Sequence, residues 1–270
     1  MRRDLSGKRV ILTGATGGIG RATAEALLRA GARLVIAARS APDLEQLAAD
    51  LRQLGEVVPV ACDVTVAGDR GRLIETAVRA LGGLDILINN SGVGSFGHFA
   101  TSTEDVVRRV MEVNFFGPVE LVRLAVPHLT AGTQPAVVNV ASMTGRLGMP
   151  AWPEYSASKF ALVGMSEALR GEFARFDVDV LTIVPGLTNS GFDRHMLRKD
   201  GRMSIPFGTG MPPERVAAGI VEAIRRNRRE TVLGTEARWM LRFKRFLPRV
   251  LNWLIARKVK KLYSQPVGSS

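Results

Sequence analysis

The sequence predicts an α/β protein in which about seven strands form one doubly wound parallel sheet with helices on both faces. Short runs rich in Val, Ile and Leu recur along the chain, and longer amphipathic segments with helical spacing separate them. The apolar runs do not alternate with polar residues, which is typical of parallel strands buried on both faces. This alternation of strand and helix implies right-handed crossovers and the Rossmann architecture.

The expected elements follow one another in a regular order. We expect strands over residues 8–14, 32–39, 57–62, 84–90, 135–142 and 178–184, with a short seventh at 230–234. We expect helices over residues 19–30, 42–54, 67–81, 103–129, 154–175 and 213–226. Gly31 and Gly55 follow the first two helices, where glycine is a typical helix stop.

Length and composition are typical of one globular domain with an appendage. The 270 residues are 46% hydrophobic and 23% charged, and no linker divides them. We therefore expect a catalytic domain over residues 1–235, a basic amphipathic extension over 236–263 and a flexible tail over 264–270. The single cysteine, Cys62, excludes an internal disulfide, and because the three histidines lack metal-ligand spacing we expect no metal site.

The distribution of charge and hydropathy bears on location. The net charge is +12, and 13 Lys and Arg residues against two Glu lie between Arg225 and Lys261, so the rest of the chain is nearly neutral. No apolar run approaches the roughly 20 residues that cross a bilayer, and the first residues lack signal-peptide features. We expect a cytoplasmic protein.

A glycine-rich loop joins the first strand to the first helix, and it reads Thr13-Gly14-Ala15-Thr16-Gly17-Gly18-Ile19-Gly20. Glycines permit a tight turn and a close approach of the backbone to a pyrophosphate, while the helix N-terminus offers free N–H groups to phosphates. We predict a dinucleotide site whose contacts include Gly14, Thr16, Gly17, Gly18, Ile19 and Gly20. A purely structural turn is the alternative.

The ends of the next strands carry further candidate contacts to a cofactor. An NAD site usually has an acidic residue after the second strand, whereas an NADP site needs a cation for the 2′-phosphate. Arg39 stands there with no acidic neighbour, so we predict NADP(H) in preference to NAD(H). A solvated surface arginine is the alternative. Asp63, with Val64 beside it, is placed to accept a hydrogen bond from adenine, and Asn90 to form a wall around the cofactor.

The strongest candidate for chemistry is the segment Tyr155-Ser156-Ala157-Ser158-Lys159. Positions i and i+4 share a helix face, so Tyr155 and Lys159 are neighbours. Because an ammonium and the positive nicotinamide of an oxidised cofactor favour the phenolate, we expect the pKa of Tyr155 to fall toward neutrality. Tyr155 then acts as a general acid/base, and Ser142 donates a hydrogen bond to the substrate oxygen.

Taken together, these motifs resemble the short-chain dehydrogenase/reductase family over roughly residues 5 to 235. The resemblance rests on residues 13–20, Asn89-Asn90-Ser91-Gly92, Asn114, Ser142, Tyr155 to Lys159 and Pro185-Gly186, with Ser91 where alanine is usual. It implies that Asn114 supports a proton relay through water to Lys159, which also binds the nicotinamide ribose. It implies that Pro185, Gly186 and Thr188 border the carboxamide. The family commonly forms dimers and tetramers, so we expect a homodimer or homotetramer.

The expected activity is an NADP(H)-dependent interconversion of a carbonyl and an alcohol on a small hydrophobic, lipid-like substrate. Residues 188–211 lie where this family has its substrate lid, and they include Phe192, Met196, Leu197, Met203, Ile205, Pro206 and Phe207. The same apolar residues are equally able to pack the lid down without touching a substrate. The alternative function is a catalytically silent NADP(H)-binding sensor or scaffold, against which the complete set Asn114, Ser142, Tyr155 and Lys159 argues.

The extension combines aromatic and basic residues. On a helical wheel Trp239, Phe243, Phe246, Val250 and Leu254 fall together, with Arg242, Arg245, Arg249 and Asn252 opposite, and Pro248 breaks or kinks the helix. This pattern is typical of a helix at a membrane interface, so we expect peripheral contact with an anionic membrane. Docking on the protein's own body or on another subunit is the alternative. Binding of nucleic acid is not expected, because no recognised module accompanies the charge.

Overall fold

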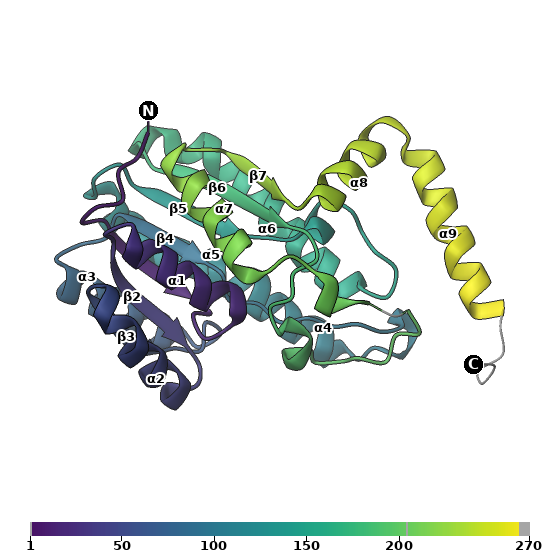
Figure 1. Ribbon diagram of the computed structural model, residues 1–270, viewed down its shortest axis with the longest axis horizontal. Coiled ribbons are helices and arrows are strands. Elements are labelled where there is room, and N and C mark those ends of the chain that lie inside the picture. The colour runs from purple at the N-terminus through teal and green to yellow at the C-terminus, as the bar shows by residue number, and fades with distance from the viewer. Residues whose placement is uncertain (1, 204, 265–270) are drawn as a thin grey trace.

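Seven parallel strands form one sheet at the centre of the computed structural model, which describes residues 2–203 and 205–264 (Figure 1). The strands are β1 (Arg9–Thr13), β2 (Arg33–Ala38), β3 (Val57–Ala61), β4 (Ile86–Asn89), β5 (Ala136–Val140), β6 (Asp179–Pro185) and β7 (Glu230–Leu233). They lie in the order β3-β2-β1-β4-β5-β6-β7. The strand order reverses between β1 and β4, and this is where α/β sheets of this kind bind their ligands.

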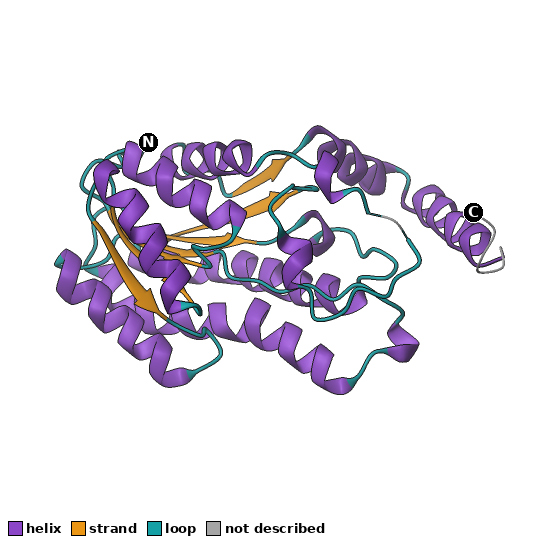
Figure 2. Cartoon of the chain, turned by 60° about the horizontal axis from the view of Figure 1, so that its bottom comes forward, coloured by secondary structure: helices purple, strands orange, loops and turns teal. Residues whose placement is uncertain are grey.

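Helices cover both faces of the sheet, as Figure 2 shows. They are α1 (Gly18–Arg29), α2 (Ala41–Leu51), α3 (Ala67–Leu81), α4 (Glu104–Met111), α5 (Gly117–Thr130), α6 (Pro153–Glu172) and α7 (Pro213–Arg225). Leu34 and Ile36 of β2 pack with α1, α2 and α7, whereas Val35 and Ala37 pack with α3 and α5. Successive strand residues therefore enter opposite cores, which confirms the doubly wound sheet.

Three of the expected helices differ in detail from the structure. The helix expected over 103–129 is α4 and α5 joined by a π-helical segment, Glu112–Phe116. Pro118 has no N–H to bond the carbonyl of Asn114, and such a gap in the hydrogen-bond ladder favours a π-bulge. The helices expected over 42–54 and 154–175 end earlier, at α2 and α6, and each continues as a short 3₁₀ turn.

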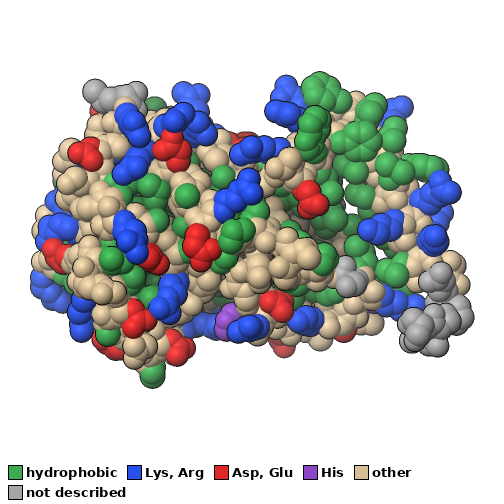
Figure 3. Space-filling model, viewed as in Figure 1, with side chains coloured by type: hydrophobic (Ala, Val, Ile, Leu, Met, Phe, Trp, Pro, Cys, Tyr) green, Lys and Arg blue, Asp and Glu red, His purple; other side chains and the backbone are tan. Residues whose placement is uncertain are grey.

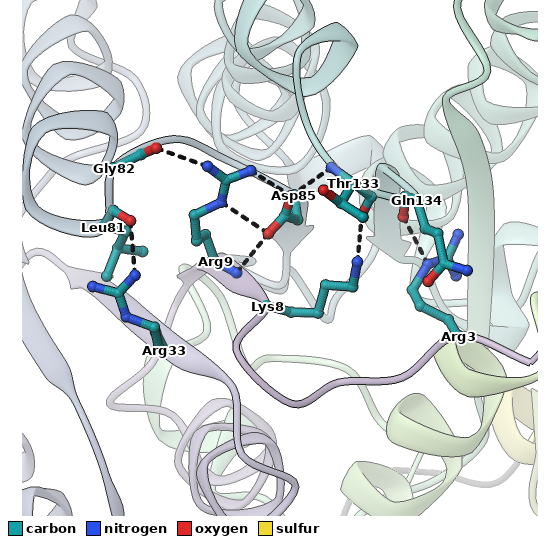
Figure 4. Close-up of polar contacts among 9 residues, drawn as sticks. All are labelled: Arg3, Lys8, Arg9, Arg33, Leu81, Gly82, Asp85, Thr133 and Gln134. Atoms are coloured by element: carbon teal, nitrogen blue, oxygen red, sulfur yellow. Dashed lines mark hydrogen bonds and ion pairs between the residues drawn. The ribbon is translucent and has the colours of Figure 1, made fainter.

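The amino-terminal ends of the strands are tied together by buried charges, on the side of the sheet away from the glycine loop (Figure 4). Arg9 makes a two-pronged ion pair with Asp85, with Nη2–Oδ1 and Nε–Oδ2 distances of 2.7 and 2.9 Å. Asp85 also accepts a hydrogen bond from the Thr133 backbone N–H. Burial raises the pKa of Asp85, but these hydrogen bonds outweigh burial and hold it below its usual value.

The last two helices, α8 (Thr235–Phe246) and α9 (Pro248–Ser264), extend away from the sheet (Figure 1). The break expected at Pro248 is confirmed, because α8 ends at Phe246 and α9 begins at Pro248. Residues 239–254 therefore do not form one continuous helix, and the expected grouping of their side chains on one helical wheel is wrong. Within α8, Arg242 is not opposite Trp239 as expected, because its guanidinium lies 5.5 Å from the centre of the Trp239 ring. Of the tail expected over 264–270, residues 265–270 lie outside the described part of the chain.

None of the helices within residues 2–203 and 205–264 is both long enough and apolar enough to span a bilayer.

Candidate active site

A cavity of about 380 Å³ lies beyond the carboxyl ends of the strands, at the point where the strand order reverses. All the residues that the sequence predicts as cofactor contacts line it: Gly14, Thr16, Gly17, Gly18, Ile19, Gly20, Arg39, Asp63, Val64, Asn90, Tyr155, Lys159, Pro185, Gly186 and Thr188. Ser142 lines it too, whereas Asn114 lies behind its wall. The fold thus gathers residues from positions 14 to 188 into one site.

The glycine loop is built so that side chains are excluded from it. Gly14 has a φ of +64°, and a Cβ atom there would lie 2.8 Å from the Cα atom of Ser91. A Cβ atom on Gly20 would overlap the carbonyl oxygen of Gly14. Helix α1 begins directly after this loop with Gly17 as its N-cap. The first N–H groups of the helix have no partner within it, and they lie at the end of the helix that lines the cavity.

Asn90 positions the glycine loop as well as lining the cavity. Its side-chain Nδ2 donates hydrogen bonds of 3.1 Å to the carbonyl oxygens of both Thr13 and Gly14. The Thr13 hydroxyl in turn accepts from the backbone N–H groups of Asn90 and Ser91. These bonds hold the ends of β1 and β4 at a fixed separation, which fixes the floor of the cavity.

Arg39 and Asp63 differ in how they are bound at the far end of the cavity. Arg39 is exposed, and among the residues that the structure describes its guanidinium has no hydrogen bond or ion pair. Asp63 is already bound, through Oδ1 to Thr65 and through Oδ2 to Arg109 at 3.1 Å. Burial raises the pKa of Asp63, but these bonds outweigh it and keep the carboxylate charged. Sequence reasoning missed Arg109, which is 46 residues away along the chain.

Tyr155 and Lys159 lie on successive turns at the start of α6, as the spacing predicts. Both are buried, and the Lys159 Nζ is 5.8 Å from the centre of the Tyr155 ring. Nζ also donates a 3.0 Å hydrogen bond to the carbonyl oxygen of Val140, at the end of β5. The Ser142 Oγ accepts from the backbone N–H and the hydroxyl of Thr144, and a side-chain hydrogen bond joins Ser142 to Tyr155.

Burial dominates the titration of this pair. It raises the pKa of Tyr155 to about 12, although the neighbouring Ser142 acts in the opposite direction. It lowers the pKa of Lys159 to about 8. In the chain by itself, desolvation of the phenolate thus outweighs the effect of its neighbours. The fall of the Tyr155 pKa expected with an oxidised nicotinamide bound stays a prediction. The positive charge of an oxidised nicotinamide would lower the Tyr155 pKa, and the chain by itself lacks that charge.

Asn114 is fully buried within the π-helical segment and makes direct hydrogen bonds. Its Nδ2 donates to the Val93 carbonyl at 2.9 Å and to the Ser158 hydroxyl at 3.0 Å, and its Oδ1 accepts from the Val93 N–H. It therefore connects the loop after β4 to the helix that carries Tyr155 and Lys159. Its part in a proton relay stays a prediction.

Apolar side chains surround Tyr155 on the side away from the glycine loop. Phe96 and Trp152 are buried with Tyr155, and the Trp152 and Phe192 rings each lie 5.4 Å from the Tyr155 ring. The cavity is also lined here by Met149, His195, Met203, Ile205 and Phe207. The expected lid segment thus supplies part of the wall, although Leu197 is exposed. Sequence reasoning missed Trp152, even though it precedes Tyr155 by one helical turn.

Cys62 lines the cavity as a buried thiol, and burial raises its pKa to about 12. A thiol in this state is unreactive at neutral pH. Across residues 2–203 and 205–264 no group of His, Cys, Asp and Glu side chains is arranged to hold a metal ion.

Comparison with known proteins gives a consistent result. Residues 8–200 match the short chain dehydrogenase family. A dehydrogenase/reductase SDR family protein 7-like of Anopheles gambiae is 32% identical over 273 residues, covering 97% of this chain and 86% of that protein. A dehydrogenase/reductase SDR family member 7B of Bos taurus is 34% identical over 244 residues, covering 86% and 75%.

A solved structure gives the same indication. The crystal structure of a short chain dehydrogenase/reductase from Burkholderia phymatum in complex with NAD superposes with a TM-score of 0.82. It is 26% identical in sequence, and the match covers 90% of this chain and 94% of that one. Together with the family match over residues 8–200, this shows that the chain belongs to the short-chain dehydrogenase/reductase family and is an NAD(P)-dependent oxidoreductase acting on CH–OH groups.

Proposed function

We propose that this oxidoreductase uses NADP(H) in preference to NAD(H), and that it reduces the carbonyl group of a small hydrophobic, lipid-like molecule. The observation that carries the proposal is that the two ends of one cavity are lined by different kinds of side chain. At one end stands the cation of Arg39, which has no ion-pair partner among the residues that the structure describes. At the other, the reacting Tyr155 lies among apolar side chains.

The residues present fit an NADP(H) molecule. The glycine loop leaves room for a pyrophosphate beside the start of α1, and Arg39 offers a charge to a 2′-phosphate after β2. No carboxylate follows β2 in the position that would bind the ribose hydroxyls of NAD and repel that phosphate. When bound, the nicotinamide supplies the hydride for reduction or takes it up in oxidation.

The chain's own groups handle the substrate oxygen and its proton. Ser142, which is hydrogen-bonded to Tyr155 in the chain by itself, donates to the carbonyl oxygen of a bound substrate in a hydrogen bond that strengthens as negative charge develops there. Tyr155 gives its phenolic proton to the same oxygen. Because the pKa of Tyr155 is about 12, the phenol holds its proton throughout the physiological range. We propose reduction as the direction in the cell because NADPH usually drives reductions.

The character of the substrate follows from the wall around Tyr155. Trp152, Phe192 and Phe207 form an aromatic surface, and Met203 and Ile205 of the lid segment extend it. Phe96 packs against Trp152. Burying an apolar substrate against such a wall is favourable in proportion to the area removed from water. A long-chain or polycyclic carbonyl compound therefore gains more binding free energy than a small one.

Turnover on a graded series of substrates tests this proposal. Purified enzyme is given NADPH or NADH with aldehydes and ketones that range from short-chain to long-chain and steroidal. We expect NADPH to be the better reductant and kcat/KM to rise with apolar surface. Turnover of short polar carbonyls alone would contradict the substrate class. NADPH binding without turnover of any compound would favour the catalytically silent sensor instead.

The cofactor preference has its own test in Arg39→Asp. Loss of a charged contact to the 2′-phosphate is expected to weaken NADPH binding by roughly 10- to 100-fold while NADH binding stays the same or improves. Arg79→Asp is the matched control, because Arg79 is exposed on α3 and lies outside the cavity. If the Arg39 variant bound NADPH as tightly as the wild type, the assignment would fail.

A further inference from the structure

The arm, which we define as α8 and α9 over residues 235–264, exposes an unusual amount of apolar surface. Six of the eleven large apolar side chains that are exposed in the described part of the chain belong to it: Trp239, Phe246, Leu247, Val250, Trp253 and Leu254. Figure 3 shows green hydrophobic side chains gathered over the arm, with blue Lys and Arg side chains at its edges. Exposed apolar patches of this kind mark interaction surfaces.

Helix α8 turns three different sides to its surroundings. Ala237 is buried against Gly186, and Lys244 donates to the backbone carbonyl of Arg146, so this side faces the body. Trp239 and Phe246 point outward and are 64% and 75% exposed. The remaining side carries arginines along the edge between body and solvent. The apolar and basic sides of α8 are therefore adjacent, as a helix at a membrane interface requires.

A basic groove of about 890 Å³ runs along that arginine side of α8. Its lining includes six cationic side chains but a single carboxylate, that of Glu230, which already pairs with Arg146. The guanidinium groups of Arg228, Arg242 and Arg245 have no hydrogen bond or ion pair to any carboxylate within the described residues. Such groups are suited to phosphate oxygens, which arginine binds through two parallel N–H donors.

Helix α9 is fixed in place at its far end. The Tyr263 hydroxyl lies 2.6 Å from Nε2 of His98, and the Arg202 guanidinium lies 4.9 Å from the Tyr263 ring centre. Leu251 is buried on the inner side, while Trp253 is 57% exposed on the outer side. The outer apolar face of the arm is thus held in position before any partner arrives.

We propose that the arm docks this enzyme on an anionic membrane surface, with the outer aromatic and leucine side chains in the interface and the basic groove around lipid phosphates. Charge selects this partner. The arm carries nine Lys and Arg residues and one acidic residue, Glu236, so it is attracted to acidic lipids. Two copies of so basic a surface would repel each other, which argues against a second copy of this chain as the occupant.

A hollow between the arm and the body adjoins the catalytic cavity. Met149 lines both that cavity and the hollow between α6 and α9, which Ile255 and Val259 line from the arm. A lipid-like substrate that left the interface through this hollow would reach the cavity of the reacting tyrosine. This consequence rests on the proposed function, whereas docking itself does not.

Vesicle binding tests docking without any use of activity. Full-length protein is sedimented with phosphatidylcholine vesicles that contain either no anionic lipid or roughly one-third phosphatidylglycerol. We expect binding to the anionic vesicles only, reversed by high salt. Acyl chains brominated near the interface are expected to quench wild-type tryptophan fluorescence but not that of Trp239→Phe/Trp253→Phe, which retains only the buried Trp152. Failure to bind the anionic vesicles would overturn the proposal.

Matched variants locate the docking surface. Arg242→Glu/Arg245→Glu is expected to lower the partition coefficient at least about tenfold, while Arg79→Glu on α3 leaves it nearly unchanged. Leu247→Ser is expected to weaken binding more than Val66→Ser, because both side chains are about equally exposed, at 47% and 48%, but only Leu247 lies on the arm. Equal effects of arm and control variants, or a soluble dimer that Leu247→Ser dissociates, would contradict docking.

Discussion

The body and the arm differ in how far their charged side chains are paired and how far their aromatic side chains are buried. In the body, Arg9 and Asp85 bind each other, and Tyr155 is 9% exposed among other rings. In the arm, Arg242 and Arg245 have no carboxylate partner among the described residues, and Trp253 is 57% exposed. Unpaired cations beside exposed aromatic rings add little to the stability of a chain in water. The charged groups of the body therefore find partners within the chain, whereas the arm is the region for which we propose a partner outside it.

The cavity is the exception within the body, because there the chain buries groups at a cost to its own stability. Lys159 has its pKa lowered to about 8 by burial, and a single hydrogen bond to Val140 only partly offsets that. Buried ionisable groups of this kind are common at catalytic sites, where function rather than stability retains them. Variants in the cavity and in the arm should therefore differ in both activity and stability.

The largest contrast is expected from Lys159→Met. We predict a loss of turnover of about 10³-fold, because Lys159 lies beside the reacting Tyr155. We also predict that the free energy of unfolding increases by an amount on the order of 2 kcal/mol at neutral pH. The folded pKa of Lys159, about 8, lies below its ordinary value of 10.5. The unfolded wild type therefore holds the proton more tightly, and wild-type stability rises as pH increases through this window.

Thermal or denaturant unfolding of both proteins from neutral pH to about pH 10 checks this sign. The advantage of Lys159→Met should be largest below pH 8 and shrink toward pH 10.5. Arg245→Met in the arm is the control, since its cation is exposed, and it should change the free energy of unfolding by less than about 0.5 kcal/mol. An advantage that stayed constant with pH would show that the burial of Lys159 is not its cause.

A smaller effect is expected from Gly20→Ala in the glycine loop. Its new Cβ atom would overlap the carbonyl oxygen of Gly14, which is backbone and unable to move aside. We predict a loss of roughly 2 kcal/mol in the free energy of unfolding, with weaker dinucleotide binding. Gly68→Ala on α3 meets no atom within 4 Å and should instead stabilise by up to about 1 kcal/mol. Similar unfolding curves for the two variants would argue against a tightly packed loop.

The smallest effect is expected where the arm touches the body. Tyr263→Phe removes the hydroxyl that contacts His98, a loss of about 1 kcal/mol at most. We predict that hydrogen exchange of the α9 amides becomes up to roughly fivefold faster, while the midpoint of global unfolding does not move. A lowered global midpoint would mean that α9 belongs to the cooperative body rather than to a separately opening arm.

The sequence was sufficient for the succession of strands and helices along the chain and for most of the cavity, because both depend on local patterns. Buried apolar runs mark strands, and glycine, Tyr155 and Lys159 stand at spacings set by turns and helices. Arg109 and Phe96 were missed because only tertiary folding brings them to the site. The π-helical segment and the faces of α8 were misjudged for a related reason, since Pro118 and packing against the body act on an otherwise ordinary helical pattern.

Other predictions from the sequence concern properties that the fold does not determine. Cytoplasmic location, the homodimer or homotetramer and the division at residue 235 depend on surfaces and surroundings rather than on the fold. The contacts of Thr188 and Asp63 with a cofactor depend on its bound position. The cavity lining makes these contacts accessible, and binding measurements on the variants would assign them.

The most direct test of the central claim is the rate of NADPH oxidation by Tyr155→Phe at saturating NADPH and ketone. Phenylalanine preserves the ring that packs against Trp152 and Phe192 and removes only the proton donor. We predict a fall in kcat of about 10³-fold or more, with the dissociation constant of NADPH unchanged. A variant that reduced the ketone at the wild-type rate would show that the proton comes from elsewhere and that this site is not the centre of the reaction.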